Sequence, residues 1–162
     1  MNACIEADRR LSLAWDALGS VEDPEIPALS IVDLGLIRSV QPRSDGTLEI
    51  EISPTYMGCP ATEVIRRSAE RALAGAGIGG FVVTSVLSPA WTSDWITPEG
   101  RRKLEMYGIV PPERSNGSMR KLSCPRCRSV DTETLSEFGS TPCKALLRCR
   151  ACLEPFEYFK CI

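Results

Sequence analysis

Two short motifs decide the fold of the C-terminal part of the chain: Cys124-Pro125-Arg126-Cys127 and Cys149-Arg150-Ala151-Cys152. In each motif a tight turn places two thiolates on one side of a loop, and two such loops complete a tetrahedron of sulfur around a metal ion. The 21 residues between the motifs match the spacing of a zinc ribbon. We therefore predict a structural Zn²⁺ bound by Cys124, Cys127, Cys149 and Cys152. Mononuclear iron in the same site, or four cysteines buried as small apolar side chains, are the alternatives.

The segments beside these motifs indicate a small module joined to a larger domain. The stretches 132–138 and 144–147 can supply hairpin strands, and a module of about forty residues rarely folds without a metal or disulfides. Residues 120–162 carry 8 basic and 5 acidic side chains, whereas residues 1–119 carry 11 and 16. We predict a domain at 1–109, a linker rich in proline and polar residues at 110–119, and a zinc-ribbon module at 120–162.

Hydrophobic periodicity predicts helices and strands in turn along residues 1–109. A helix is expected at 6–19, then a hairpin of strands at 31–40 and 48–52 around Ser44-Asp45-Gly46. A second helix at 60–76, a strand at 81–87 and a short helix capped by Thr97 follow. The order α-β-β-α-β-α indicates an α+β fold with two layers.

Composition narrows the chemistry that this chain can perform. The sequence has eight cysteines and no histidine, so histidine ligands and Ser-His or Cys-His dyads are excluded. Its start does not resemble a signal peptide, and no apolar run reaches the ~20 residues of a membrane helix. We expect a cytoplasmic protein whose cysteines serve metal or thiol chemistry rather than disulfides. The net charge of −2 does not favour binding to nucleic acid or to a membrane surface.

Cys59 is the most suggestive single residue of the N-terminal part. It lies in the loop 55–60, and if Pro60 opens the following helix, Cys59 is its N-cap. The helix dipole and the free N–H groups of the first turn favour a thiolate there, which is a nucleophile and a soft ligand for iron. A buried, inert cysteine is the alternative.

Three further groups are weaker candidates. Carboxylates at Glu22, Asp23, Glu25 and Asp33 could gather near the Cys59 loop, although most charge clusters are solvated. Trp91, Asp94 and Trp95 form a candidate rim for a protein partner, although loop aromatics more often belong to a core. Cys143 and Cys161 lie outside the four-cysteine set and are either ligands of an iron–sulfur cluster or packed structural thiols.

Several of these segments together resemble known families. The stretches 23–26, 33–37 and 55–60 resemble the SufT/MIP-type family of small α/β domains linked to iron–sulfur cluster assembly. The stretch 88–96 and the tail 138–161 narrow the resemblance to the PaaD family of the bacterial phenylacetyl-CoA epoxidase system. The resemblance covers essentially the whole chain.

The resemblance implies a function and roles for named residues. It implies a cytoplasmic bacterial maturation factor for phenylacetate catabolism, rather than an enzyme with turnover of its own. Such a factor helps to install the cluster of the iron–sulfur flavin reductase of the epoxidase. Cys59 would be the cluster-transfer thiol, with Cys143 and Cys161 as further ligands of a transient iron–sulfur cluster. The pocket around Cys59 would be shaped by Asp23, Glu25, Asp33 and Thr55.

The expected partners are the epoxidase components and the iron–sulfur assembly machinery. A homodimer that shares a cluster also fits the sequence. Two other functions stay open at this point. One is an accessory epoxidase subunit that acts in electron transfer or complex assembly. The other is a protein-interaction module in which zinc only stabilises the binding surface.

Overall fold

The structure, a computed structural model, describes residues 2–113 and 122–162, with side chains described from residue 6 onward. The chain divides into two compact units, residues 1–91 and residues 92–162. The α+β class predicted from the sequence is confirmed. None of the helices in the described residues is long and apolar enough to cross a membrane.

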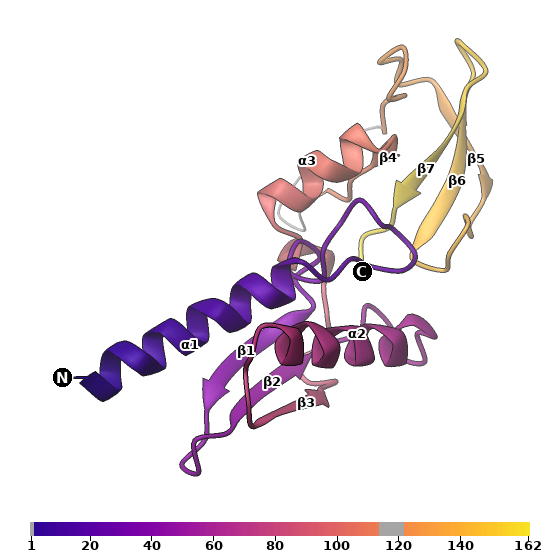
Figure 1. Cartoon of the computed structure of the whole chain (residues 1–162). Helices are drawn as coiled ribbons and strands as arrows, with labels where there is room; N and C mark the ends of the chain where they lie inside the picture. Colours follow the sequence, from indigo (N-terminus) through magenta and orange to yellow (C-terminus); the bar gives the residue numbers. More distant parts are fainter. Residues whose placement is uncertain (1, 114–121) are drawn as a thin grey trace. The chain divides into compact units, whose positions relative to one another are not determined.

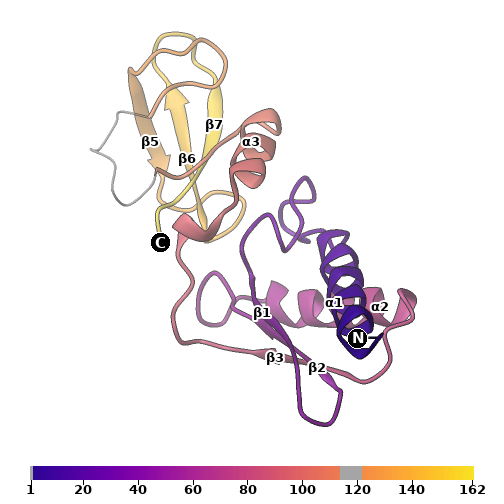
Figure 2. The same ribbon diagram turned by 90° about the vertical axis from the view of Figure 1, so that its left-hand side faces the viewer.

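The first unit is a three-stranded sheet with two helices (Figures 1 and 2). Its elements are α1 (Asn2–Gly19), β1 (Ile37–Pro42), β2 (Leu48–Ile52), α2 (Ala61–Gly75) and β3 (Phe81–Ser85). The strand order is β1-β2-β3, with β1 antiparallel and β3 parallel to β2. Because parallel neighbours need a crossover, α2 is the connection between β2 and β3.

The apolar face of β2 explains how the helices are seated. Leu48, Ile50 and Ile52 are buried, whereas the glutamates between them are half exposed. Helix α1 contacts β1, α2 contacts β3, and the two helices contact each other, so they cover the same face of the sheet. The buried stripe of α2 consists of Ala61, Ile65, Ala69 and Leu73. This stripe holds the start of α2, and hence the Cys59 loop, against the sheet.

The first strand is shorter than the sequence predicts. It begins at Ile37 rather than near residue 31. Residues 31–35 form a turn instead, in which Gly35 adopts a positive φ of 66° that favours glycine. The hairpin between β1 and β2 is confirmed, with Val40 opposite Ile50.

The second unit is a four-stranded sheet with a short helix. After a 3₁₀ turn at Ser93–Trp95 come α3 (Pro98–Met106), β4 (Ile109–Val110), β5 (Thr132–Ser136), β6 (Lys144–Cys149) and β7 (Pro155–Phe159). The order is β4-β7-β6-β5, with β5, β6 and β7 antiparallel and β4 parallel to β7. Thr97 caps α3 as predicted, because its hydroxyl accepts a hydrogen bond of 2.9 Å from the Gly100 N–H.

The compact units differ from the predicted domain limits. Strand β4 pairs with β7, at Ile109–Glu157 and Val110–Tyr158, so the end of the predicted N-terminal domain packs with the ribbon. The predicted linker at 110–119 therefore starts within β4, and its residues 114–119 lie outside the described residues. The domains 1–109 and 120–162, as independently folding pieces, stay predictions.

Candidate functional site

The four predicted ligand cysteines meet at one end of the ribbon sheet. The Sγ atoms of Cys124, Cys127, Cys149 and Cys152 all lie within 4.8 Å of one another. The Sγ–Sγ distances are 3.7 Å for Cys124–Cys152 and 3.5 Å for Cys127–Cys149. A zinc–sulfur bond of ~2.3 Å in a tetrahedron requires a sulfur–sulfur distance of about 3.8 Å. The four thiols are therefore grouped closely enough to hold one tetrahedral metal ion.

The two cysteine loops share the same backbone design. The Cys124 N–H donates to the Ser129 carbonyl at 2.9 Å, and the Cys149 N–H donates to the Glu154 carbonyl at 2.9 Å. In both loops the residue after the second cysteine has a positive φ, 64° at Arg128 and 62° at Leu153. Residues other than glycine rarely adopt this backbone conformation, which costs them about 1–2 kcal/mol each. Its repetition in both loops indicates that the surrounding contacts impose the turn.

Burial and charge explain why these thiols suit a metal. Cys124 and Cys149 are fully buried, Cys152 is half-buried and Cys127 is exposed. The backbone N–H of Cys152 lowers the pKa of Cys149 to about 7. The Glu154 N–H lowers the pKa of Cys152, but burial and the neighbouring thiols outweigh it and raise that pKa to about 12. A divalent cation binds thiolates and so relieves this crowding of like charges.

Cys143 and Cys161 lie outside this group of four. Cys143 is 3% exposed and its Sγ lies 3.1 Å from the Thr141 hydroxyl. Cys161 is exposed, and its Sγ lies 3.1 Å from the Tyr158 hydroxyl. Burial, together with the neighbouring Cys161, raises the pKa of Tyr158 above its ordinary value. A role of either thiol as a cluster ligand stays a prediction.

Cys59 lies in a turn that leads into α2. Its N–H donates to the Tyr56 carbonyl at 3.3 Å, and its own carbonyl accepts from the Thr62 N–H at 3.2 Å. Gly58 has a φ of 81°, which the turn requires. The N-cap of α2 is Pro60, so Cys59 precedes the cap by one residue instead of occupying it. Its side chain is half-buried beside the first turn of a helix that no side chain caps.

Two of the predicted pocket carboxylates build the loop between α1 and β1. Asp23 is 6% exposed, and its Oδ1 accepts from the N–H groups of Glu25 and Ile26 at 2.9 and 2.8 Å. Asp33 is 8% exposed, and its Oδ2 accepts from the Ser30 N–H and hydroxyl. Aspartate commonly accepts backbone bonds two or three residues ahead, a signal that the Asp23-Pro24-Glu25 turn already carries. The pocket-shaping role of Asp23, Glu25, Asp33 and Thr55 stays a prediction.

The three residues of the predicted partner surface have different environments. Trp91 is 4% exposed, and its indole N–H donates to the Leu34 carbonyl at 3.0 Å. This tryptophan therefore belongs to the core of the first unit and is not available at a surface. Asp94 is exposed and Trp95 is half-buried. Contact with a partner stays a prediction for these two residues.

Comparison with known proteins agrees with both halves of this description. Residues 14–88 match the family model described as iron–sulfur cluster assembly protein, and residues 110–160 match the PaaD zinc beta ribbon domain. A relative from Escherichia coli (strain K12) is 48% identical over 151 residues, or 91% of each chain. Its provisional name describes it as one of the subunits of 1,2-phenylacetyl-CoA epoxidase.

Other relatives match the first unit. The Fe-S protein maturation auxiliary factor YitW of Bacillus subtilis (strain 168) is 38% identical over 79 residues, which cover 48% of this chain and 76% of YitW. A crystal structure of a domain of unknown function, DUF59, from Bacillus anthracis covers 62% of this chain and 96% of its own, at a TM-score of 0.57 and 22% identity. This last likeness shows the fold alone.

These observations define a class of protein with an iron–sulfur assembly domain followed by a four-cysteine ribbon. Within that class, the chain belongs to the PaaD family, because the match to the Escherichia coli relative spans nearly the full length of both proteins.

Proposed function

We propose that this protein is a cytoplasmic maturation factor that helps to install the iron–sulfur cluster of the reductase component of a phenylacetyl-CoA epoxidase. One observation supports this most strongly. A half-buried thiol at the start of a helix lies in an iron–sulfur assembly domain, and the same chain carries the PaaD ribbon. Relatives of the assembly domain are named maturation factors, which supports a role in cluster maturation. The name of the full-length relative supports the phenylacetyl-CoA epoxidase as the system in which this protein acts.

In this proposal Cys59 acts as a thiolate toward a cluster that is cargo. The Cys59 thiol gives up its proton as its sulfur forms a bond to an iron of the incoming cluster, while the donor's thiolate leaves that iron and takes up this proton. The client's thiolates then displace Cys59 in the same way, so that no electron is gained or lost. The first-turn N–H groups of α2 would stabilise negative charge at this position. The proposal includes a homodimer, in which a second copy of the chain shares the cluster. Sedimentation tests this point.

The ribbon has a structural part in this proposal. Cys124, Cys127, Cys149 and Cys152 would hold Zn²⁺, which when bound supplies a fixed cross-link between the two cysteine loops. The Arg126 guanidinium and the Glu154 carboxylate, 2.6 Å apart, join the same two loops from outside. The iron–sulfur assembly machinery and the epoxidase components are the proposed partners.

Replacing Cys59 tests the proposed function. We expect Cys59→Ala to abolish the support that the protein gives to epoxidase activity in cells, while the fold and metal content stay unchanged. The half-buried thiol makes no side-chain hydrogen bond that the fold depends on among the described residues, so its loss should cost little stability. The measurement is phenylacetyl-CoA epoxidase activity in cells that express the variant as their sole copy. Met57→Ala, in the same loop and 80% exposed in the wild type, is the matched control and should retain activity. Full activity of Cys59→Ala would exclude the proposed role of the thiol.

The name of the full-length relative also favours a second candidate function, an accessory subunit of the epoxidase. A subunit that takes part in electron transfer or holds the complex together would be needed during turnover. A maturation factor would be needed only beforehand. Omission of the protein from an epoxidase reconstituted with cluster-replete reductase separates the two. We expect turnover at the normal rate, and a loss of turnover would favour the subunit.

A further inference from the structure

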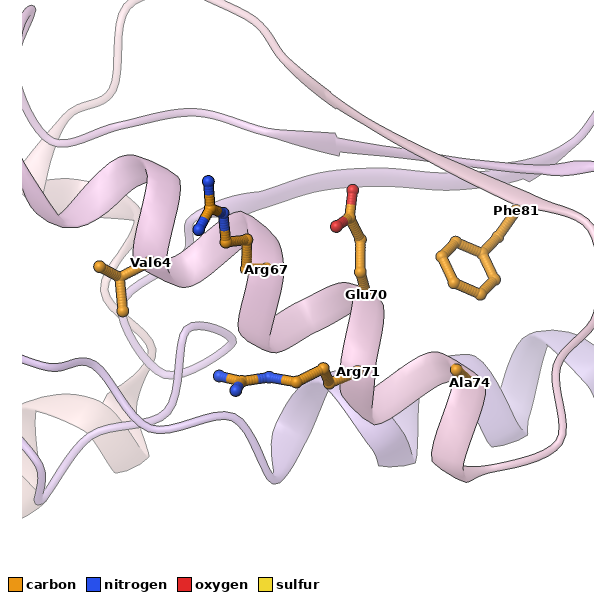
Figure 3. A pocket seen from close by; sticks show the side chains of 6 residues that line it. All are labelled: Val64, Arg67, Glu70, Arg71, Ala74 and Phe81. Carbon is orange, nitrogen blue, oxygen red and sulfur yellow. The ribbon is translucent and has the colours of Figure 1, made fainter.

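Helix α2 carries a second, outward stripe that the fold does not use. Its buried stripe is complete with Ala61, Ile65, Ala69 and Leu73. Yet Val64 is 50% exposed and lies, with Ala74 and the half-buried Phe81, along a groove of about 720 Å³. Figure 3 shows the lining side chains following one another along the helix, with Phe81 of β3 facing its C-terminal part. The spacing of positions 64, 67, 71 and 74 is that of one helix face.

The groove has a small excess of positive charge, because Arg67 and Arg71 outnumber Glu70 in its lining, on a unit that is otherwise acidic. Residues 1–91 contain 7 arginines, no lysine and 12 acidic residues. Three of the seven arginines, at 66, 67 and 71, lie within two turns of α2 and face two glutamates. An acidic ligand would be repelled by most of this unit, and attraction would be concentrated here.

Both groove arginines have exposed side chains, and of the two only Arg67 forms an ion pair within the described residues. Glu63 accepts from Arg66 at 2.7 Å and from Arg67 at 2.9 Å, which lowers the pKa of Glu63 to about 2 and keeps it charged. The Arg67 side chain is still 69% exposed. Arg71 donates to the Ser68 hydroxyl at 3.1 Å and forms no ion pair within the described part of the chain. A carboxylate from another molecule can therefore reach both guanidinium groups at a small desolvation cost.

We propose that this groove is the docking surface for an acidic segment of the client protein, with an apolar side chain of that segment against Val64, Ala74 and Phe81. The inference rests on the proposed function, because the groove follows the Cys59 loop along the same helix. A segment lying on α2 would run toward the N-terminal end of the helix, where Cys59 directly precedes the N-cap residue Pro60. Docking there holds the acceptor cysteines of the client near the transfer thiol. The pattern could have been found in the sequence from Arg67 and Arg71, which stand four residues apart and therefore on one face of the helix.

A charge reversal in the groove tests this surface directly. The probe is the apo form of the iron–sulfur reductase, titrated with the full-length protein in a calorimeter at low and at physiological salt. We expect Arg71→Glu to weaken binding about tenfold or more, and Val64→Ser to weaken it less, because opposed charges are replaced by like ones in the first case only. Binding of the wild type should weaken as salt is added. The matched control is Arg9→Glu, an exposed arginine on α1, which should bind as the wild type does.

The outcomes separate this inference from the proposed function. Equal binding by Arg71→Glu, Val64→Ser and the wild type would overturn the docking surface and leave the maturation role standing. A wild type that does not bind the reductase at all would overturn both the surface and the proposed client. Dissociation of a wild-type dimer by Arg71→Glu in sedimentation would instead make the groove a contact between two copies. Cys59→Ala should bind normally, which distinguishes loss of docking from loss of transfer.

Discussion

The Cys149→Ser variant of the full-length protein is expected to lose its metal and the ordered ribbon, while residues 1–91 stay folded. Cys149 is fully buried, and it belongs both to the four-sulfur site and to the small core of the ribbon. That core contains few large side chains, mainly Leu147 and Phe156 with the half-buried Leu122 and Tyr158 around them. Structural zinc supplies about 10–16 kcal/mol in small domains, far more than such a core can replace.

Metal analysis together with amide NMR spectra measures this effect. The wild type should contain one zinc per chain and show dispersed amide signals for β5, β6 and β7. Cys149→Ser should lose both, and so should the wild type after treatment with a strong chelator. Cys161→Ser is the matched control, because that thiol is exposed and lies outside the four-sulfur group. A Cys149→Ser variant with a fully dispersed ribbon spectrum would show that the metal is not what holds this sheet together.

The second large effect concerns an ion pair inside the ribbon. The Lys144 side chain is 4% exposed, and its Nζ lies 2.9 Å from Oε2 of Glu157. Burial raises the pKa of Glu157, but the Ser140 N–H and Lys144 outweigh it and hold this pKa below its ordinary value. We expect Glu157→Gln to destabilise the ribbon by about 3 kcal/mol, because it leaves a buried ammonium group without its counter-charge. Glutamine can still accept the Ser140 hydrogen bond through its one oxygen, so the substitution removes the negative charge and turns an NH₂ group toward Lys144.

Native-state hydrogen exchange of the β6 amides in the zinc-loaded protein reports the opening free energy of the ribbon alone. The double variant Lys144→Met/Glu157→Gln removes both charges and should recover most of the loss. A single variant as stable as the wild type would mean that solvent reaches Lys144. A double variant as unstable as the single one would mean that the loss does not come from the unpaired charge of Lys144.

Close packing also accounts for a glycine beside this ion pair. A Cβ on Gly139 would lie 2.7 Å from Oε1 of Glu157 and 3.2 Å from the Lys144 Cβ. Because Gly139 donates its N–H to the Lys144 carbonyl at 2.8 Å, the loop cannot move away without losing that bond. Nothing in the local sequence indicates this requirement, since it depends on two side chains from neighbouring strands.

The ribbon site shows what local spacing can predict. Each Cys-x-x-Cys motif sets the positions of its two sulfurs through a short turn, so the spacing of the cysteines is enough to predict which four thiols meet. The hairpin of β1 and β2 was equally predictable, because alternation along Leu48–Ile52 and a turn at Ser44-Asp45-Gly46 are local signals. The N-cap of α3 at Thr97 was predictable for the same reason, because a cap is also a local signal.

Where a signal depends on distant partners, the sequence was ambiguous. The residues beside Trp91 in the sequence are typical of a surface rim. Its burial depends on a distant contact, because the indole N–H donates to the carbonyl of Leu34, 57 residues away. Strand β4 has only two residues, too few for a hydrophobic period, and it is a strand because it pairs with the edge of β7. Asp23 and Asp33 could have been solvated charges, but backbone N–H groups of a folded loop donate hydrogen bonds to their carboxylates, which are buried.

The class of fold, the four cysteines that meet in the ribbon and the loop that presents Cys59 could all be predicted from the sequence, because turns, caps and hydrophobic periods act over a few residues. The tertiary structure alone decided which charges are buried and paired, which tryptophan belongs to the core, and which helix face stays open to a partner. Burial is a property of three-dimensional neighbours, and those neighbours come from strands and loops far apart in the chain.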